Sequence, residues 1–428
     1  MNPQSIWFRF VLPGTLALLL AAGVVFSASV SAALASTEAQ LHANALTEPQ
    51  SADPLNTYVE VAIPKAPLPL LSGGYSGIAP SIHLIRLSAS LPLSNIDPIE
   101  NPARRRFGRV DLSFAILHGL PLAALLICIF ISRRAAGHRP TKRLWDYAAE
   151  HIALPLSAWF AFCFAALLSA QYGFGLRLDG NDAFLRIAAW TTGIALYSAF
   201  WLLLFLYLLL RLASATRAAL VYSAAYIALG LLLPGLLQSV ALAAAQPEPR
   251  IALTLERRQR TAFHSAVDRD KVLRMQKYFG GSIDFDALSL PAKQTLTAIA
   301  IEQEMGPRID SFLNRIRLFE TLDGIFAWFS PVSLTRGFID DLAGTGIRRY
   351  ASFREQSAAF SEAWRKHMLP KLLRREALDY DDLRNAPKFH FEEEPGLALA
   401  SRSALSIAYL AILCLCLALL SARQYRRQ

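Results

Sequence analysis

Residues 187–210 read IAAWTTGIALYSAFWLLLFLYLLL, with Arg186 before them and Arg211 after them. A charge-free apolar stretch of this length can cross a hydrocarbon layer about 30 Å thick as a helix. Five further charge-free runs of 20 or more residues occur along the 428-residue chain. They lie between Arg9 and Glu38, Asp111 and Arg133, Glu150 and Arg177, Arg217 and Glu248, and Arg402 and Arg423. The sequence therefore predicts an all-α polytopic membrane protein with six transmembrane helices.

Many of the basic residues flank these runs. The net charge is +10, and 54% of the residues are hydrophobic. Basic side chains at the ends of apolar helices orient a membrane protein and contact anionic lipid. No basic tract is interleaved with aromatic residues in the manner of a nucleic-acid groove, so we expect no nucleic-acid partner. All four cysteines fall inside apolar runs, which leaves the polar stretches without a disulfide framework.

The connection after the second run, SRRAAGHRPTKRLWDY, is strongly basic. It holds five basic residues against Asp146, which predicts a cytoplasmic position. The connection 211–217 and the tail 423–427 are also basic, and they fall on the same side if the chain crosses the membrane six times. Both termini are then cytoplasmic. The arginines within residues 104–109 lie on the expected outer side, against the charge rule.

The first run has two interpretations. It contains Ala33-Leu34-Ala35, which fits a signal-peptidase site, and cleavage there would leave five spans. The run is nearly twice as long as a typical signal core, so we favour an uncleaved span.

Six spans divide the chain into five parts. We expect the first span over residues 1–37, an extracytoplasmic Pro/Ser-rich segment over 38–111, spans two to five over 112–245, an extracytoplasmic helical domain over 246–400, and the sixth span with a cytoplasmic tail over 401–428. Prolines disfavour helix in the first outer segment. Short extended pieces are expected there at 58–63 and 82–87, with little independent core.

The second outer segment has helical periodicity. We expect the fifth span to continue as a helix over residues 251–279. Further helices are expected at 291–304, 308–322, 334–342 and 347–373. Ser330-Pro331, Gly344-Thr345-Gly346 and Pro370 are interpreted as helix stops. Trp328 and Trp364 are expected to anchor the core of this domain.

Residues that could carry chemistry are few. No Gly-rich loop precedes a Lys-Ser or Lys-Thr pair, so ATP-driven work would need a separate ATPase. Asp284 and Asp286 resemble a carboxylate pair for a metal, but helix capping or a solvated turn explains them better. No nucleophile, metal set or acid/base pair stands out, and we expect neither enzymatic activity nor a cofactor.

His118 is a polar residue in the second run, which by default suggests a functional role. Its position beside Gly119 and Pro121 also fits a side chain near the interface, and we favour this second interpretation. No span carries an acid or base in its middle, which disfavours ion-coupled transport. Pro121, Pro155 and Pro234 can kink their spans.

Two segments resemble a known family. Residues 328–373, WFSPVSLTRGFIDDLAGTGIRRYASFREQSAAFSEAWRKHMLPKLL, with APKFHFEEEP at 386–395, are similar to the extracytoplasmic region of a subgroup of ABC-2-type transporter permeases. These proteins are often labelled as permease components related to multicopper-enzyme maturation. Residues 101–132, NPARRRFGRVDLSFAILHGLPLAALLICIFIS, are similar to the same family's second span and the stretch leading into it.

The resemblance implies a permease subunit of an ATP-driven exporter in the bacterial inner membrane. Its partners would be a separate ABC ATPase subunit and a second permease protomer, in a homodimer or a heterodimer. The candidate ATPase-coupling loop comprises Arg133, Arg134, Gly137, Arg139, Lys142, Arg143 and Trp145. This loop lacks the acidic, Gly-Thr-Leu-containing stretch that the family usually has there. The alternative function is a non-transporting membrane-anchored assembly or sensor protein whose outer helical domain is the working part.

Overall fold

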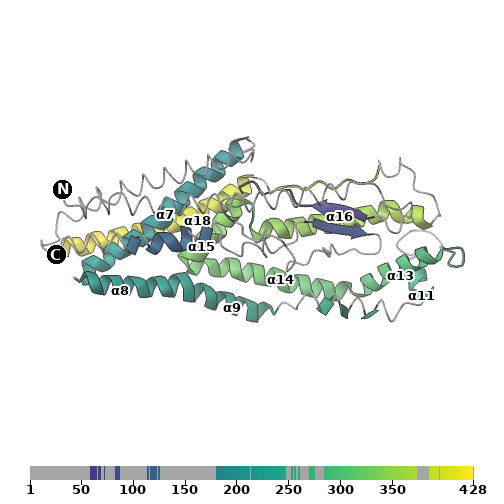
Figure 1. Cartoon of the computed structure of the whole chain (residues 1–428), viewed down its shortest axis with the longest axis horizontal. Helices are drawn as coiled ribbons and strands as arrows, with labels where there is room; N and C mark the ends of the chain where they lie inside the picture. The colour runs from purple at the N-terminus through teal and green to yellow at the C-terminus, as the bar shows by residue number, and fades with distance from the viewer. Residues whose placement is uncertain are drawn as a thin grey trace, which may run out of the picture.

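The computed structural model is elongated (Figure 1). It describes residues 58–64, 66–68, 72, 82–86, 113–114, 116–122, 124–125, 180–212, 214–246, 252–253, 255–256, 259–260, 269–274, 284–373, 385–394 and 396–427.

Three described helices are long and apolar enough to cross a membrane, over Leu185–Leu212, Thr216–Ala245 and Ala398–Arg427. The first belongs to α7 (Gly180–Leu212) and the last to α18 (Gly396–Arg427). The middle one joins α8 (Ala215–Tyr226), the π-helix η4 (Ile227–Leu232) and α9 (Leu233–Ala245). These helices coincide with the fourth, fifth and sixth apolar runs, so the chain is a membrane protein.

Of the other three apolar runs, only the second is described, and only in part. Residues 113–114, 116–122 and 124–125 of the second run are helical. The first run with its possible cleavage site, the third run with Pro155, and the arginines within 104–109 lie outside the described residues.

The basic ends of the apolar helices lie at one end of the molecule. The α7–α8 connection and the C-terminal end of α18 lie at the same end of the molecule, and α16 lies toward the other (Figure 1). Basic residues are found at this shared end, in the 211–217 connection and in the tail that carries Arg423, Arg426 and Arg427. Two of the three segments that the charge rule assigned to one side of the membrane, the 211–217 connection and the tail, therefore lie at the same end of the molecule, and the third, the connection after the second run, lies outside the described residues.

The fifth span does not continue as one helix into the following residues, contrary to expectation. Helix α9 ends at Ala245, and Gln246 adopts a left-handed conformation with φ 42° and ψ 55°. Pro247 follows directly, and a residue before proline is disfavoured in the right-handed helical region. Within the stretch 251–279 that was expected to be helical, the described residues 252–253, 255–256 and 259–260 are helical, and the next labelled helix is α11 (Arg269–Arg274).

The helices expected between the fifth and sixth spans are present. They are α13 (Leu290–Glu304), α14 (Gly306–Phe326), η5 (Ala327–Phe329), α15 (Pro331–Ala343) and α16 (Ile347–Leu373). Ser289 and Ser330 cap α13 and α15 with their side-chain oxygens, as serine commonly does at a helix start. Pro370 lies inside α16 rather than ending it, so its interpretation as a helix stop was wrong.

A two-stranded antiparallel sheet adds to the helical architecture. Strands β1 (Tyr58–Ala62) and β2 (Ile82–Arg86) pair with Tyr58 opposite Arg86, which confirms the two extended pieces. The sheet contributes to a core with α16, whereas the sequence suggested little core of its own. The buried members of this core are Val61, Ile63, Ile85, Phe353, Phe360, Trp364, Met368, Ala386 and Phe391.

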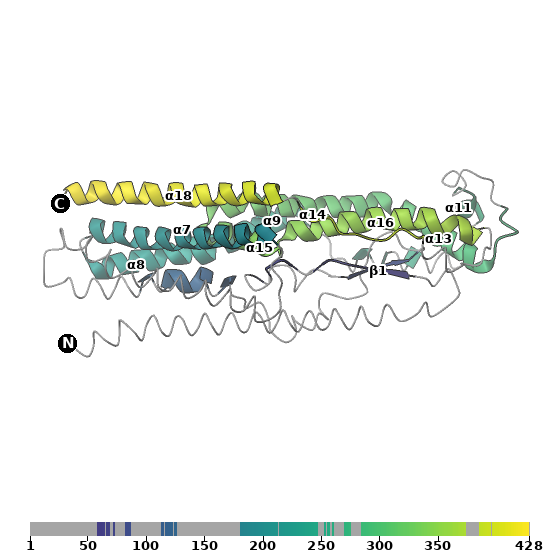
Figure 2. The same ribbon diagram turned by 90° about the horizontal axis from the view of Figure 1, so that it is seen from above.

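We call α11, α13, α14 and α16 with this sheet the distal domain. Figure 2 shows α18 running along one edge of the molecule, with α16 lying farther from the C-terminus along the same long axis. Trp364 is buried in the distal-domain core, as expected, with 4% of its surface exposed. Trp328 does not anchor this core: it is 37% exposed, and its ring lies 5.2 Å from that of Tyr409 in α18. Trp328 belongs to η5, which follows α14 and lies beside the sixth span, and this corrects the expectation for that residue.

Replacing Trp364 by Ala should destabilise the distal domain by about 3–5 kcal/mol, because a buried aromatic side chain would leave a cavity. Urea unfolding of the purified protein, followed by limited proteolysis of the distal domain, measures this change. Trp328→Ala is the matched control, and it should leave the distal domain's protease resistance close to that of the wild type. Equal losses in the two variants would contradict the assignment of Trp364 alone to this core.

Candidate functional site

Helices α14 and α15 both connect the distal domain to the spans: α14 packs against α9, and α15 enters the core of the apolar helices. Helix α15 packs against α7, η4 and α18. Val332, Phe338 and Ile339 are buried in the same core cluster as the aromatic residues of α7. A Cβ atom at Gly193 of α7 would come within 2.2 Å of the Phe338 ring, so glycine is what allows α15 to approach α7 this closely. A displacement of the spans would therefore displace α15 as well, because a close-packed core transmits movement between its helices.

The hydroxyl of Ser330 joins the start of α15 to the fifth span. In the π-helical register of η4, the N–H of Leu233 bonds the carbonyl of Ala228. The N–H that would bond the next carbonyl, that of Leu229, belongs to residue 234, which is proline and has none. Ser330 Oγ donates to this carbonyl oxygen at 2.8 Å and also accepts from the N–H of Ser333 at 3.2 Å. One hydroxyl thus satisfies a carbonyl in span five and caps α15.

A second proline in an apolar run is compensated in the same way. In an α-helix the carbonyl of Leu117 would bond the N–H of residue 121, which is Pro121. Tyr197 of α7 donates its hydroxyl to Leu117 O at 2.6 Å. Tyr222 of α8 donates to the carbonyl of Pro121 itself at 2.9 Å. Unsatisfied backbone carbonyls are costly in lipid, so these tyrosines hold the second run against spans four and five.

These hydroxyl groups belong to an aromatic cluster centred on Trp201. Its ring makes edge-on contacts with Tyr197, Tyr222 and Tyr226, at centroid distances of 6.2, 5.7 and 5.6 Å. His118 reaches the same cluster, with Nδ1 at 2.9 Å from the hydroxyl of Tyr226. The half-buried His118 therefore has a protein partner on α8, and its hydrogen bond contributes to helix packing.

Charged residues lie together where α15 ends and α18 begins. Arg186 donates to the carbonyl of Leu342 at 3.0 Å, and Arg402 Nε lies 3.6 Å from Asp341 Oδ2. The guanidinium of Arg402 also bonds Glu394 through two hydrogen bonds. We call Arg186, Arg402, Asp341 and Glu394 the charged collar.

The collar carboxylates have opposite pKa shifts. Burial raises the pKa of Asp341, and the charge of Arg402 opposes this rise. The hydrogen bond from Arg402 lowers the pKa of Glu394, so this carboxylate stays ionised at neutral pH. The collar therefore holds a persistent ion pair at the base of the distal domain.

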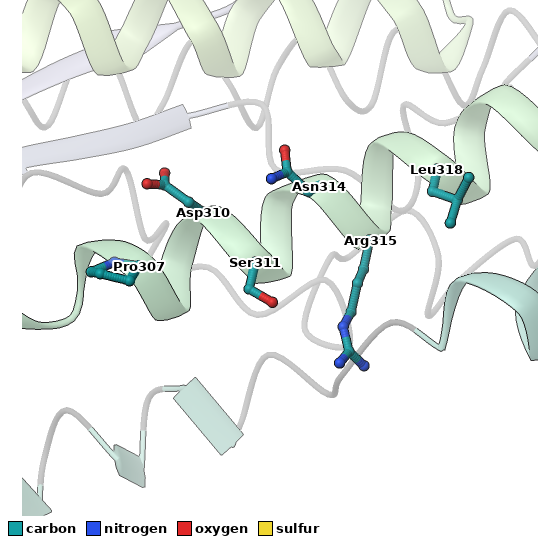
Figure 3. Close-up of a pocket in the computed structure, with 6 residues that line it drawn as sticks. All are labelled: Pro307, Asp310, Ser311, Asn314, Arg315 and Leu318. Carbon is teal, nitrogen blue, oxygen red and sulfur yellow. The ribbon is translucent and has the colours of Figure 1, made fainter.

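A shallow pocket of about 430 Å³ lies on α14 (Figure 3). It is lined by Pro307, Asp310, Ser311, Asn314, Arg315 and Leu318. In Figure 3 Asp310 and Asn314 point to one side of the helix, whereas Arg315 points to the other. Arg315 Nη1 donates to the carbonyl of Gln246 at 3.0 Å, so it secures the end of α9. The lining comes from one helix, and its polar groups do not converge on a common point.

The candidate ATPase-coupling loop, from Arg133 to Trp145, lies outside the described residues. Asp284 accepts a hydrogen bond from the N–H of Asp286 at 3.1 Å, which is the turn contact expected of this pair. Among the described residues, no group of three or more His, Cys, Asp or Glu side chains is arranged to hold a metal. Sequence reasoning missed the roles of Ser330 and Tyr197. The signal for both was a proline inside an apolar run.

Comparison with known proteins gives one match. Residues 251–392 match a family described as a domain of unknown function, DUF3526. The match covers most of the segment between spans five and six, including α13 to α16. Neither the curated proteins nor the solved structures contain a match to the chain.

The proline and serine at the junction can be tested as a pair. Ser330→Ala should cost about 1–3 kcal/mol through the unsatisfied Leu229 carbonyl, and about 1 kcal/mol more through the lost helix cap. Pro234→Ala returns an N–H at position 234, so in that background Ser330→Ala should cost only the cap contribution. Unfolding of the four proteins in detergent micelles measures the difference.

Ser330→Thr is the control, because it keeps the hydroxyl and should remain close to wild-type stability. An equal cost of Ser330→Ala in both backgrounds would show that the hydroxyl does not compensate for Pro234.

Proposed function

We propose that this chain is the membrane-spanning permease subunit of an ATP-driven ABC-type exporter. It would cross the bacterial inner membrane six times, with the distal domain on the extracytoplasmic side. Separate ATPase subunits and a second permease protomer, identical or different, would complete the assembly. The protein would work within the lipid bilayer, without a nucleic-acid partner.

The packing of α15 among the spans is the observation that carries this proposal. An exporter driven by cytoplasmic ATPases must pass a conformational change along its spans to the opposite side of the membrane. Here α15 packs against α7, η4 and α18, and it is covalently continuous with the distal domain. A shift of any of these spans would move α15, and with it α14 and α16. The resemblance of residues 328–373 to ABC-2-type permeases supports the same function.

The basic end of the molecule would be the cytoplasmic end. The 211–217 connection and the end of α18 lie together there (Figure 1). We propose that the loop from Arg133 to Trp145 reaches the ATPase at this end. Arginine and tryptophan are enriched at binding hot spots, which suits a protein contact.

A second candidate is a membrane-anchored assembly or sensor protein without transport activity. The distal domain has hydrophobic clusters of its own, one with the sheet and α16 and another with α11 and α13. The DUF3526 match also lies between the spans rather than within them. These observations favour a working part outside the membrane.

Replacing Arg139, Lys142 and Arg143 together with Ala should weaken co-purification with a P-loop ATPase encoded beside this gene, because the positively charged contact is lost. We expect the wild-type chain in nanodiscs to retain the ATPase and to stimulate its ATP hydrolysis several-fold. The triple variant should insert normally but lose most of this stimulation.

Arg423, Arg426 and Arg427 provide a matched control. Their joint replacement with Ala removes the same number of positive charges from the proposed cytoplasmic side, and it should leave ATPase association intact. If both triple variants retain the ATPase, the 133–145 loop is not the coupling element. If the wild-type chain neither binds nor stimulates any such ATPase, the assembly or sensor function is favoured.

A further inference from the structure

The turn between α14 and α15 is formed by a short charge-free stretch. Residues 324–335 read GIFAWFSPVSLT, between Asp323 and Arg336. Twelve residues are too few to cross a bilayer as a helix, but apolar stretches of this length suit a re-entrant or interfacial segment. The chain descends through the end of α14, turns at η5 and returns as α15.

A contact with the sixth span shows how far this turn lies inside the apolar region. The hydroxyl of Tyr409 donates to the carbonyl of Trp328 at 3.0 Å. Tyr409 follows Arg402, the collar arginine at the start of the charge-free part of α18, by seven residues. At 1.5 Å per residue, Trp328 lies about 10 Å farther into the apolar region than the Arg402 backbone.

A contact with the fifth span gives an independent estimate of the depth of the turn. Ser330 bonds the carbonyl of Leu229, which is twelve residues beyond Arg217 at the basic end. Twelve helical residues rise about 18 Å. A hydrocarbon layer of about 30 Å that begins near Arg217 would then extend about 12 Å beyond Ser330 toward the distal domain. The two spans place the turn at the same depth.

The charges that flank the turn agree with this depth. Asp323 and Arg336 lie seven and six residues from Ser330 along α14 and α15. A rise of about 10 Å along each helix places both charges closer to the level of Arg402 than the tip is, and α15 reaches that level at Asp341, which lies 3.6 Å from Arg402 Nε. At the other end of α15, Leu342 is bonded by Arg186 of the collar. The neck of the hairpin, where α14 and α15 approach the collar, therefore carries charges, and its tip carries none.

The tip exposes large apolar side chains. Ile325 is 51% exposed and Phe329 is 62% exposed, beside the partly exposed Trp328. The neighbouring face of η4 and α9 is also apolar and hollowed by a groove of about 740 Å³. The groove is lined by Ala228, Leu229, Leu231, Leu232, Leu233, Gly235, Leu236 and Ser239. An exposed apolar surface of this kind, level with the interior of two spans, suits acyl chains.

We infer that residues 324–335 form a re-entrant hairpin whose tip, Ile325, Trp328 and Phe329, lies among the acyl chains of the leaflet on the distal-domain side. The hairpin enters and leaves this leaflet without crossing the bilayer. The inference depends on the spans and their hydrogen bonds, and it holds for a transporter and for a sensor alike.

Spin labels in a cysteine-free background of the full chain test this location. Phe329→Cys and Ile325→Cys report on the tip, and Leu415→Cys on the exposed face of α18 is the lipid reference. Leu318→Cys is the matched control for water, because Leu318 is exposed on the same α14 but lies about 18 Å above Ser330 by helical rise. Each variant is reconstituted in phosphatidylcholine nanodiscs, and its collision rates with oxygen and with a water-soluble nickel chelate are compared.

We expect the labels at 329 and 325 to match the one at 415, with frequent oxygen collisions and nickel collisions reduced at least five-fold relative to position 318. If both tip labels collide with nickel as often as the label at 318, the tip lies in water and the inference is wrong. If both are shielded from oxygen and nickel alike, protein covers the tip, and the assignment to lipid is equally overturned.

Discussion

The fifth span contains a carbonyl that proline deprives of its helical partner, and the hydroxyl of Ser330 supplies the missing hydrogen bond. Pro234 has no N–H, so the carbonyl of Leu229 needs a donor from another element. In water a solvent molecule would provide one. In a bilayer the donor must come from the protein, because the hydrocarbon offers none. This requirement ties the start of α15 to the fifth span and sets the position of the hairpin that precedes it.

The same constraint organises the packing of the apolar helices. Pro121 leaves the carbonyl of Leu117 without its helical donor, and Tyr197 reaches across from α7 to satisfy it. The aromatic rings that bring these hydroxyls into place surround Trp201 and form the centre of the largest buried cluster. Helix association in lipid lacks the hydrophobic driving force available in water, so close packing and hydrogen bonds between helices determine the arrangement. The prolines therefore act as specific contact points between spans.

Besides the packing of α14 against α9, the distal domain is attached to this arrangement at two levels. Ser330 and Phe338 connect it to the interior of the apolar region, and the charged collar connects it at the level of Arg402. The ion pair of Arg402 with Glu394 joins the beginning of the sixth span to the segment that precedes it. Gly344, with φ 73°, lets the chain turn between α15 and α16, where a side chain would meet Pro67. A movement of the spans would therefore reach the distal domain through a hairpin held at both its tip and its neck, which suits either a permease or a sensor.

Local sequence determined much of the helical architecture. Charge-free length identified the fourth, fifth and sixth spans, and caps and breakers located α13 to α16 to within a few residues, because hydrogen bonding in a helix is local. The two strands were also foreseen, since prolines excluded helix around them. Sequence could not show that Trp364 and Trp328 have different neighbours, because both lie in similar apolar surroundings along the chain. That difference depends on the path of α14, which brings Trp328 back to α18.

The amino-acid sequence by itself determined that the chain is a membrane protein, where three of its apolar helices run and which helices lie between the last two. The tertiary structure decided which side chains compensate for the prolines, how α15 fits among the spans and how far the α14–α15 turn descends. The reason is physical: apolar length and helix capping act between residues close in sequence. The hydroxyl that satisfies Leu229 comes from a residue 101 positions away, and only folding brings the two together.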